Sequence, residues 1–272
     1  MSEPVSRLVD IGEGLHLHVT DVGAGAPVVF LHGSGPGASG PSNFGGNGAF
    51  LASHGYRALL IDSLGYGRSD KPVDREYTLE VMAGAALRAL DTLGIPKATF
   101  VGNSQGGAQA IWIALNAPER VEALVLMAPG GLEARETYMG LRGIRSMMKA
   151  LYGPDGLTPE GLKIVFERQV VDPSLVPAEL IAERYAVAKG QPLHVFQSMR
   201  VTDQSERLNE LKMPVLALWG MDDCFCPVSG ATKIAERVPN ARVVLFTRCG
   251  HWVMVEHADV FNRTLVDFLN HG

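Results

Sequence analysis

The chain has 272 residues, of which 46% are hydrophobic, and carries a formal net charge of −5 at pH 7. This length suits one large domain or a domain with an insertion, and the apolar fraction is ample for a buried core. The acidic balance gives no electrostatic reason to expect nucleic acid or an anionic membrane as a partner. No apolar run approaches the ~20 residues that cross a bilayer, and no signal peptide is evident at residues 1–10.

Two strands are expected near the start of the chain. Residues 15–19 alternate between apolar and polar, which predicts a half-solvated antiparallel strand with His16 and His18 as surface histidines. The apolar run 28–31 is typical of a buried parallel strand, and a loop dense in glycine follows it at 32–40.

Strand and helix patterns then alternate. In order, we expect the following elements: a helix over 43–54, a strand over 57–62, a helix capped by Thr78 and running to Leu93, a strand over 98–101, a helix ending at Asn116 and a strand over 121–127. After a gap, the alternation resumes: a strand over 215–219, a helix over 228–237, a strand over 242–246 and a closing helix over 257–270.

The gap, residues 132–209, shows no convincing strand. Amphipathic helices are expected over 141–152, 159–170 and 177–189. The pattern predicts an α/β fold in which residues 1–131 and 210–272 form a mostly parallel sheet with helices on both faces. Residues 132–209 would be an inserted helical cap over the carboxyl ends of the strands, where ligands bind in such folds.

A strand, a sharp turn and a helix surround Ser104 in the stretch Gly102-Asn103-Ser104-Gln105-Gly106. In such a turn the glycines leave room where a Cβ would clash, and the strain holds the serine hydroxyl outward. The amino end of the next helix would point its free N–H groups at the same place. An exposed nucleophile there suits acyl-type chemistry.

Two later loops offer the partners that a serine nucleophile needs. Asp223 follows one predicted strand and His251 follows the last one, in the order Ser, Asp, His. Asp222 is the rival carboxylate, and His32 is a rival histidine that we expect to support its own loop instead. The three cysteines, Cys224, Cys226 and Cys249, fit a reducing cytoplasm, and no second ligand pair supports a metal site.

The glycine-rich loop after residue 31 has two readings. A dinucleotide site is disfavoured because the glycine spacing is wrong and no helix clearly opens on the loop. The alternative is an oxyanion hole, in which the main-chain N–H groups of Ser34 and Gln105 bind a developing negative charge.

Together these motifs resemble the α/β-hydrolase fold over nearly the whole chain. The stretches 32–38, 42–43, 102–107 and 249–252 further resemble the meta-cleavage product hydrolases, which hydrolyse carbon–carbon bonds during bacterial degradation of aromatic or steroid rings. The chain departs from that family at Pro41, where tryptophan is common, and at Gln105, where methionine is common.

The resemblance implies the roles of several residues. Ser104, Asp223 and His251 would be the catalytic triad. The substrate-binding positions would be Gly35, Asn43, Asn103, Arg184 and Trp252. Arg168, Arg142 and Arg145 are alternatives to Arg184 as the arginine that binds the substrate carboxylate.

The implied substrate is a small molecule, a 2-hydroxy-6-oxo-dienoate formed by ring opening. Serine attack, or attack by a serine-activated water, would release a 2-hydroxy-dienoate and a carboxylic acid without a metal or organic cofactor. A cytoplasmic homo-oligomer is expected. A carboxylesterase or cofactor-free perhydrolase with the same triad is the nearest alternative, and a non-catalytic ligand receptor is the alternative from another class. A dehalogenase or epoxide hydrolase is disfavoured because it needs a carboxylate at the position of Ser104.

Overall fold

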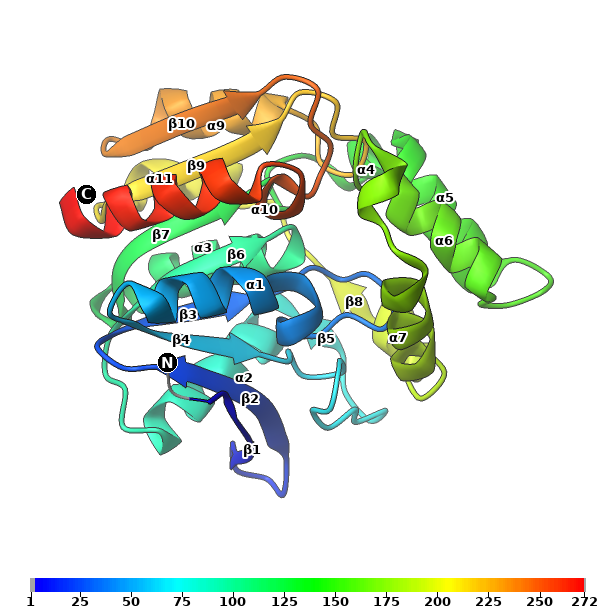
Figure 1. Ribbon diagram of the computed structural model, residues 1–272, viewed down its shortest axis with the longest axis horizontal. Coiled ribbons are helices and arrows are strands. Elements are labelled where there is room, and N and C mark those ends of the chain that lie inside the picture. Colours follow the sequence, from blue (N-terminus) through cyan, green and yellow to red (C-terminus); the bar gives the residue numbers. More distant parts are fainter. Residues whose placement is uncertain (1–2, 272) are drawn as a thin grey trace.

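The computed structural model describes residues 3–271 and is built on an eight-stranded sheet (Figure 1). Its strands are β1 (Val5–Asp10), β2 (His16–Gly23), β3 (Ala26–Leu31), β4 (Tyr56–Ile61), β6 (Ala98–Asn103), β7 (Val121–Met127), β9 (Val215–Gly220) and β10 (Ala241–Phe246). Their order in the sheet is β1-β2-β4-β3-β6-β7-β9-β10. Only β2 runs antiparallel to its neighbours, β1 and β4. The predicted mostly parallel sheet is therefore confirmed.

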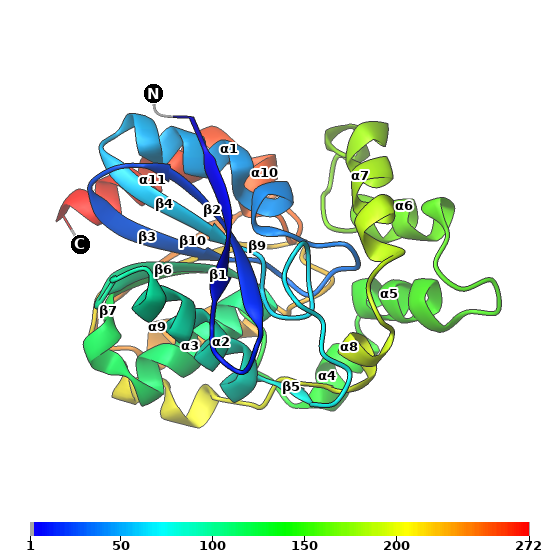
Figure 2. The same cartoon turned by 90° about the horizontal axis from the view of Figure 1, so that it is seen from below.

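Helices cover both faces of the sheet (Figures 1 and 2). One face carries α1 (Gly40–Ser53), α10 (Val253–Glu256) and α11 (Ala258–His271), and the other carries α2 (Leu79–Thr92), α3 (Gln105–Asn116) and α9 (Ser229–Arg237). Every residue of β6 is buried, as expected for a strand with helices on both sides.

Side-chain caps set where two of these helices begin. Thr78 accepts a hydrogen bond from the Val81 N–H at 3.2 Å, so α2 starts as predicted. α1 starts at Gly40, earlier than the predicted residue 43, because Ser39 and Ser42 form a reciprocal capping box. Glycines weaken the helix pattern at this point, and the cap offsets that weakness.

The segment between β7 and β9 lies beyond the carboxyl ends of the parallel strands (Figure 1). It contains α4 (Arg135–Gly140), α5 (Arg142–Tyr152), α6 (Pro159–Glu167), α7 (Ala178–Ala188) and α8 (His194–Gln197). The expectation of no strand in this segment was wrong, since β8 (Met199–Arg200) pairs with β5 (Tyr77–Thr78). Short 3₁₀ turns occur at η1 (Pro118–Arg120), η2 (Pro173–Leu175) and η3 (Ser205–Glu210).

The prediction of surface histidines on β2 is wrong for one of the two. His18 is only 6% exposed, and its Nδ1 lies 3.0 Å from Oδ2 of the buried Asp62. The loop after β4 folds back over the strand, and Ser69 Oγ accepts a hydrogen bond from the His18 N–H. The strand is therefore covered on the face that alternation had marked as solvated. None of the helices within residues 3–271 is long and apolar enough to cross a membrane.

Candidate active site

Ser104 lies on a strained turn between β6 and α3. Its φ is 55° and its ψ is −118°, which is a conformation that residues with a Cβ rarely adopt. The turn requires small residues on both sides. A Cβ on Gly102 would lie 2.5 Å from the Gly106 carbonyl oxygen, and a Cβ on Gly106 would lie 2.0 Å from the Leu31 carbonyl oxygen.

His251 and Asp223 form a buried pair on two neighbouring loops. Nδ1 of His251 lies 2.7 Å from Oδ2 of Asp223, and the side chains are 3% and 0% exposed. Oδ1 of the same carboxylate accepts the N–H groups of Phe225 (2.7 Å) and Cys226 (3.0 Å). These contacts fix the carboxylate, which can then orient the imidazole. The rival carboxylate, Asp222, is exposed.

Ser104 and His251 line the same small cavity, of about 30 Å³. Within the described chain, no hydrogen bond joins the Ser104 hydroxyl to the imidazole in this conformation. Hydrogen bonds between catalytic groups are often long in unliganded enzymes and tighten when substrate binds. The structure thus brings the serine, the histidine and the aspartate together, but the hydrogen bond between Ser104 and His251 is not formed in this conformation.

Two main-chain N–H groups are available beside Ser104. Those of Ser34 and Gln105 have no acceptor among residues 3–271, and both residues border the cavities that Ser104 lines. The loop after β3 approaches the serine closely, because a Cβ on Gly33 would lie 3.2 Å from Ser104 Cβ. β3 and β6 are neighbours in the sheet, which explains why their loops meet.

Polar and aromatic side chains line much of the small cavity. The predicted positions Gly35, Asn43, Asn103, Arg184 and Trp252 all line it. Asn103 also donates to the Met127 carbonyl oxygen (3.2 Å), which fixes its amide. Residues from the β3 loop, α1, β6, α7 and the His251 loop are therefore gathered around one space.

Arg184, on α7, is a buried cation that forms no ion pair with a carboxylate of residues 3–271. It is 1% exposed and donates from Nη2 to Asn43 Oδ1 at 2.5 Å. Its Cζ lies 5.2 Å from the centre of the Phe166 ring and 5.8 Å from that of the Trp252 ring. Burial lowers the pKa of this guanidinium to about 10. Burying a charge without a counter-ion is costly, so the site is suited to an anionic ligand.

The other arginines considered as ligands of the substrate carboxylate lie outside the small cavity. None of Arg142, Arg145 and Arg168 lines the small cavity, and Arg168 borders a separate pocket near α5 and α6. His32, the rival histidine, is fully buried behind the β3 loop.

A second, larger cavity of about 320 Å³ adjoins the first. Ser34 and Ser104 line both cavities, so Ser104 lies where they meet. The larger cavity is mostly apolar, and its lining includes Tyr138, Met139, Ile144, Met147, Met148, Leu151, Phe196, Met199 and Val201. Two arginines, Arg135 and Arg200, also line it, whereas no aspartate or glutamate among residues 3–271 does.

The sequence did not reveal three residues of this site. Phe225 stacks on the His251 ring, with centroids 5.2 Å apart. Cys226 lines the larger cavity beside Ser104. The carbonyl oxygen of Gln169, after α6, accepts the N–H groups of His251 (2.7 Å) and Trp252 (3.0 Å). Phe225 and Cys226 closely follow Asp223, so their position in the sequence could have indicated that they lie near the site. The Gln169 carbonyl contact depends on the main chain, and no feature of the sequence indicates it.

The structure offers no evident metal centre within the described part of the chain. No group of three or more His, Cys, Asp or Glu side chains there is arranged to hold a metal ion. All three cysteines are unpaired thiols.

Comparisons with known proteins identify the family of this chain. Residues 26–258 match the family described as the alpha/beta hydrolase fold. The chain is 41% identical to a 2-hydroxy-6-oxo-6-phenylhexa-2,4-dienoate hydrolase of Burkholderia cepacia, over 98% of this chain and 97% of that protein. It is 39% identical to a 2-hydroxy-6-oxononadienedioate/2-hydroxy-6-oxononatrienedioate hydrolase of Comamonas testosteroni, with the same coverage.

Solved structures show the same relationship. A meta-cleavage product hydrolase from Pseudomonas fluorescens superposes with a TM-score of 0.85 at 30% identity, covering 97% of each chain. The 2-hydroxy-6-oxo-6-phenylhexa-2,4-dienoate hydrolase from Rhodococcus gives a TM-score of 0.87 at 25% identity, covering 99% of this chain and 100% of that one. The chain therefore belongs to the α/β-hydrolase superfamily and, within it, to the meta-cleavage product hydrolases, enzymes that hydrolyse carbon–carbon bonds.

Proposed function

We propose that this enzyme hydrolyses the C5–C6 bond of a 2-hydroxy-6-oxo-dienoate and releases a 2-hydroxy-dienoate and a carboxylic acid. The observation that supports the proposal most strongly concerns Arg184. Its guanidinium is buried, lines the same small cavity as Ser104, and has no carboxylate of residues 3–271 beside it. A dienoate carboxylate would supply the missing charge. A simple esterase or perhydrolase has no need of such a group, and the relatives named above act on dienoates.

The dienoate part of the substrate would bind at the small cavity, which measures about 30 Å³ in this conformation and must widen to admit it. Arg184 would bind the carboxylate, and Gly35, Asn43, Asn103 and Trp252 would complete the surroundings of the dienoate. The enol must first become a ketone by moving its proton to C5. The two electrons of the C5–C6 bond can then leave as a conjugated dienolate, which the nearby polar groups stabilise.

Ser104, His251 and Asp223 would carry out the cleavage. His251 removes the proton of Ser104 as Oγ attacks the C6 carbonyl, and Asp223 holds the imidazole in the required tautomer. The N–H groups of Ser34 and Gln105 would stabilise the oxyanion. Breaking the C5–C6 bond leaves an acyl group on Ser104, and protonated His251 gives its proton to the departing dienolate, which becomes the 2-hydroxy-dienoate. The neutral imidazole then takes a proton from a water that attacks the acyl group, and returns it to Ser104 Oγ as the carboxylic acid leaves.

The C6 substituent would occupy the larger, methionine-rich cavity. A cavity of about 150 Å³ lined by apolar side chains holds one benzene ring, and this cavity measures about 320 Å³. Flexible methionine side chains adapt to irregular apolar shapes. We therefore propose that the preferred substituent is apolar and larger than a single six-membered ring.

Residues 132–209 would act as the lid of this site, because α7 carries Arg184 and the segment supplies most of the larger cavity. We also propose a cytoplasmic homo-oligomer. The cytoplasmic location is supported by the three unpaired thiols.

A panel of ring-opened dienoates tests the proposed function. The members would differ only at C6: methyl, phenyl, naphthyl and a short chain ending in a carboxylate, with p-nitrophenyl acetate as the simple ester. We expect kcat/KM to be highest for naphthyl and lowest for the ester. A higher kcat/KM for the ester than for every dienoate would reject the proposed reaction, whereas a preference for methyl would reject only the assignment of the larger cavity.

A further inference from the structure

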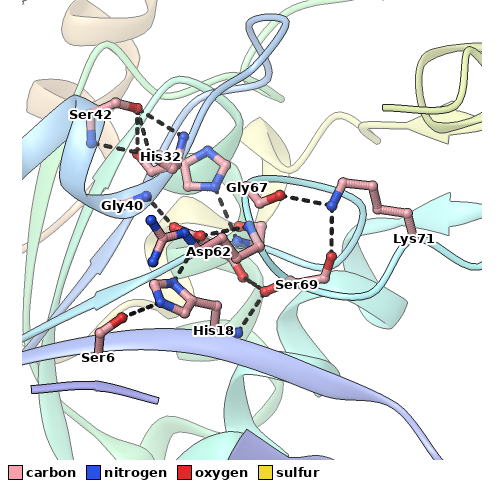
Figure 3. Close-up of polar contacts among 12 residues, drawn as sticks. Ser6, His18, His32, Gly40, Ser42, Asp62, Gly67, Ser69 and Lys71 are labelled. Atoms are coloured by element: carbon pink, nitrogen blue, oxygen red, sulfur yellow. Dashed lines mark hydrogen bonds and ion pairs between the residues drawn. The ribbon is translucent and has the colours of Figure 1, made fainter. Parts of the chain in front are cut away.

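The buried ring of His32 is held by two main-chain groups of opposite character. Its Nε2 lies 3.0 Å from the Ser63 nitrogen, and its Nδ1 lies 2.8 Å from the Gly33 carbonyl oxygen. A backbone N–H can only donate and a carbonyl oxygen can only accept. These partners therefore assign the single ring proton of neutral His32 to Nδ1, which donates to Gly33. Figure 3 shows the ring beside the cluster around Asp62.

The hydrogen bond to Gly33 has a consequence for the next residue. The Gly33 C=O and the Ser34 N–H belong to one planar peptide unit, and in a trans unit they point in opposite directions. Every peptide bond within residues 3–271 is trans. The donor on His32 thus fixes the direction of the Ser34 N–H as well as that of the Gly33 carbonyl.

The other side of Ser34 is fixed too. Tyr66 Oη donates to the Ser34 carbonyl oxygen at 3.3 Å, and the Tyr66 ring meets the His32 ring edge-on with centroids 5.2 Å apart. Ser34 lines both cavities, and its N–H is without an acceptor in the described chain. The loop is held in place while the Ser34 N–H stays available beside Ser104.

We propose that His32 is a positioning residue that aims the Ser34 N–H at the oxyanion formed during catalysis. It acts through the Gly33–Ser34 peptide and touches neither substrate nor the reacting atoms. The inference rests on the proposed function, because it requires an oxyanion next to Ser104. Burial lowers the pKa of His32 to about 4, which keeps the ring neutral and the donor pattern unchanged at neutral pH.

A matched pair of variants distinguishes the roles of the two ring nitrogens of His32. The amide of Asn reaches the position of Nδ1, so His32→Asn retains a donor to Gly33 and loses the acceptor for Ser63. The amide of Gln reaches the position of Nε2, so His32→Gln has the opposite effect. We expect His32→Gln to lower kcat by roughly 10²-fold, the order seen when one oxyanion donor is lost, with KM little changed. His32→Asn should keep a kcat much closer to that of the wild type.

A second readout reports the oxyanion directly. Trifluoroacetophenone forms a hemiketal with a catalytic serine and places a negatively charged oxygen in the oxyanion hole, whereas the product dienoate does not. His32→Gln should weaken inhibition by the ketone by a factor similar to its loss in kcat and leave product binding unchanged. Equal weakening of ketone and product binding in both variants would show a merely structural role and overturn the proposal.

The wild-type protein offers a test that does not depend on folding of the variants. Correlation of ring nitrogens and carbon-bound protons by NMR should show a protonated Nδ1 and a bare Nε2 for His32. The reverse tautomer would overturn the proposal. Full activity in His32→Gln, with Ser104→Ala inactive, would reject this inference alone, whereas full activity in Ser104→Ala would reject the proposed function.

Discussion

At the scale of single residues, the contacts of the Arg184 guanidinium indicate a role in binding substrate more than in packing. The guanidinium has aromatic neighbours and one amide acceptor but no counter-ion. Its contribution should therefore appear when an anionic substrate enters. The same residue should matter little to a substrate that has no carboxylate.

We expect Arg184→Gln to lower kcat/KM for a dienoate by roughly 10–100-fold, because a hydrogen bond to a charged group contributes about 1.5–3 kcal/mol. Hydrolysis of p-nitrophenyl acetate should change far less. The control is Arg145→Gln, an exposed arginine on α5 that lines neither cavity. Equal losses on both substrates in Arg184→Gln would contradict its role as carboxylate ligand.

His32 also predicts how stability depends on pH. Burial lowers its pKa from 6.5 to about 4, so between these values the unfolded chain binds a proton that the folded protein does not. Stability from this group is complete above pH 6.5 and is lost as the pH falls towards 4, by about 3 kcal/mol in total. Urea unfolding from pH 7 to pH 4 should show a steeper fall for the wild type than for His32→Asn. Parallel curves would contradict the assignment.

A turn motif and two loop positions single out Ser104, Asp223 and His251 in the sequence. The structure places Ser104 and His251 on one cavity and Asp223 beside the imidazole, and their catalytic roles stay a prediction. The burial of His18 was not predictable, since alternation shows which residues share a face and not whether a loop covers that face. The resemblance pointed to Arg184 among four arginines, and only the fold shows which of them reaches the cavity.

At the scale of elements, one contact couples the β3 loop to α7. Gly37 has φ +69°, and a Cβ there would lie 2.0 Å from the Arg184 carbonyl oxygen. Only glycine allows the loop and the helix to approach this closely. The position of the guanidinium therefore depends on a backbone contact with the loop that carries Ser34.

We expect Gly37→Ala to push α7 away and lower kcat/KM for dienoates by about 10²-fold, the scale of loss caused by a misplacement of about 1 Å. Gly46→Ala is the control, since Gly46 is an exposed helical glycine with no atom within 4 Å of its built Cβ. That change should leave kcat/KM intact and stabilise the protein by about 0.5–1 kcal/mol. Unchanged kinetics in Gly37→Ala would show that the contact does not position Arg184.

Periodicity predicted the long elements and missed the short ones. The bounds of the strand over 121–127 were predicted correctly, because six of its seven residues are apolar and only Glu122 interrupts the run. β1 was missed because five of its six residues are exposed, so its sequence has no buried face to reveal. β8 has two residues and is defined by pairing with β5, a contact between distant segments that local sequence does not encode.

At the scale of the whole molecule, the active site is assembled from distant parts of the chain. The proposed nucleophile, Ser104, follows β6, and its proposed base and orienting carboxylate follow β10 and β9. Arg184, which we propose as the ligand of the substrate carboxylate, lies on α7. The Gln169 carbonyl joins the helical segment to the His251 loop. In the proposed reaction, the two cavities that Ser104 lines orient the substrate, with the dienoate at the smaller cavity and the C6 group in the larger, mostly apolar one.

The most direct test of this account is release of the carboxylic acid by Ser104→Ala. Chromatography should quantify the acid, because loss of the dienoate's visible absorbance can reflect ketone formation without cleavage. Ser53→Ala, at an exposed serine on α1, is the matched control. We predict that Ser104→Ala releases acid at least ~10³-fold more slowly than the wild type, while Ser53→Ala keeps the wild-type rate. Acid release by Ser104→Ala at the wild-type rate would contradict the account.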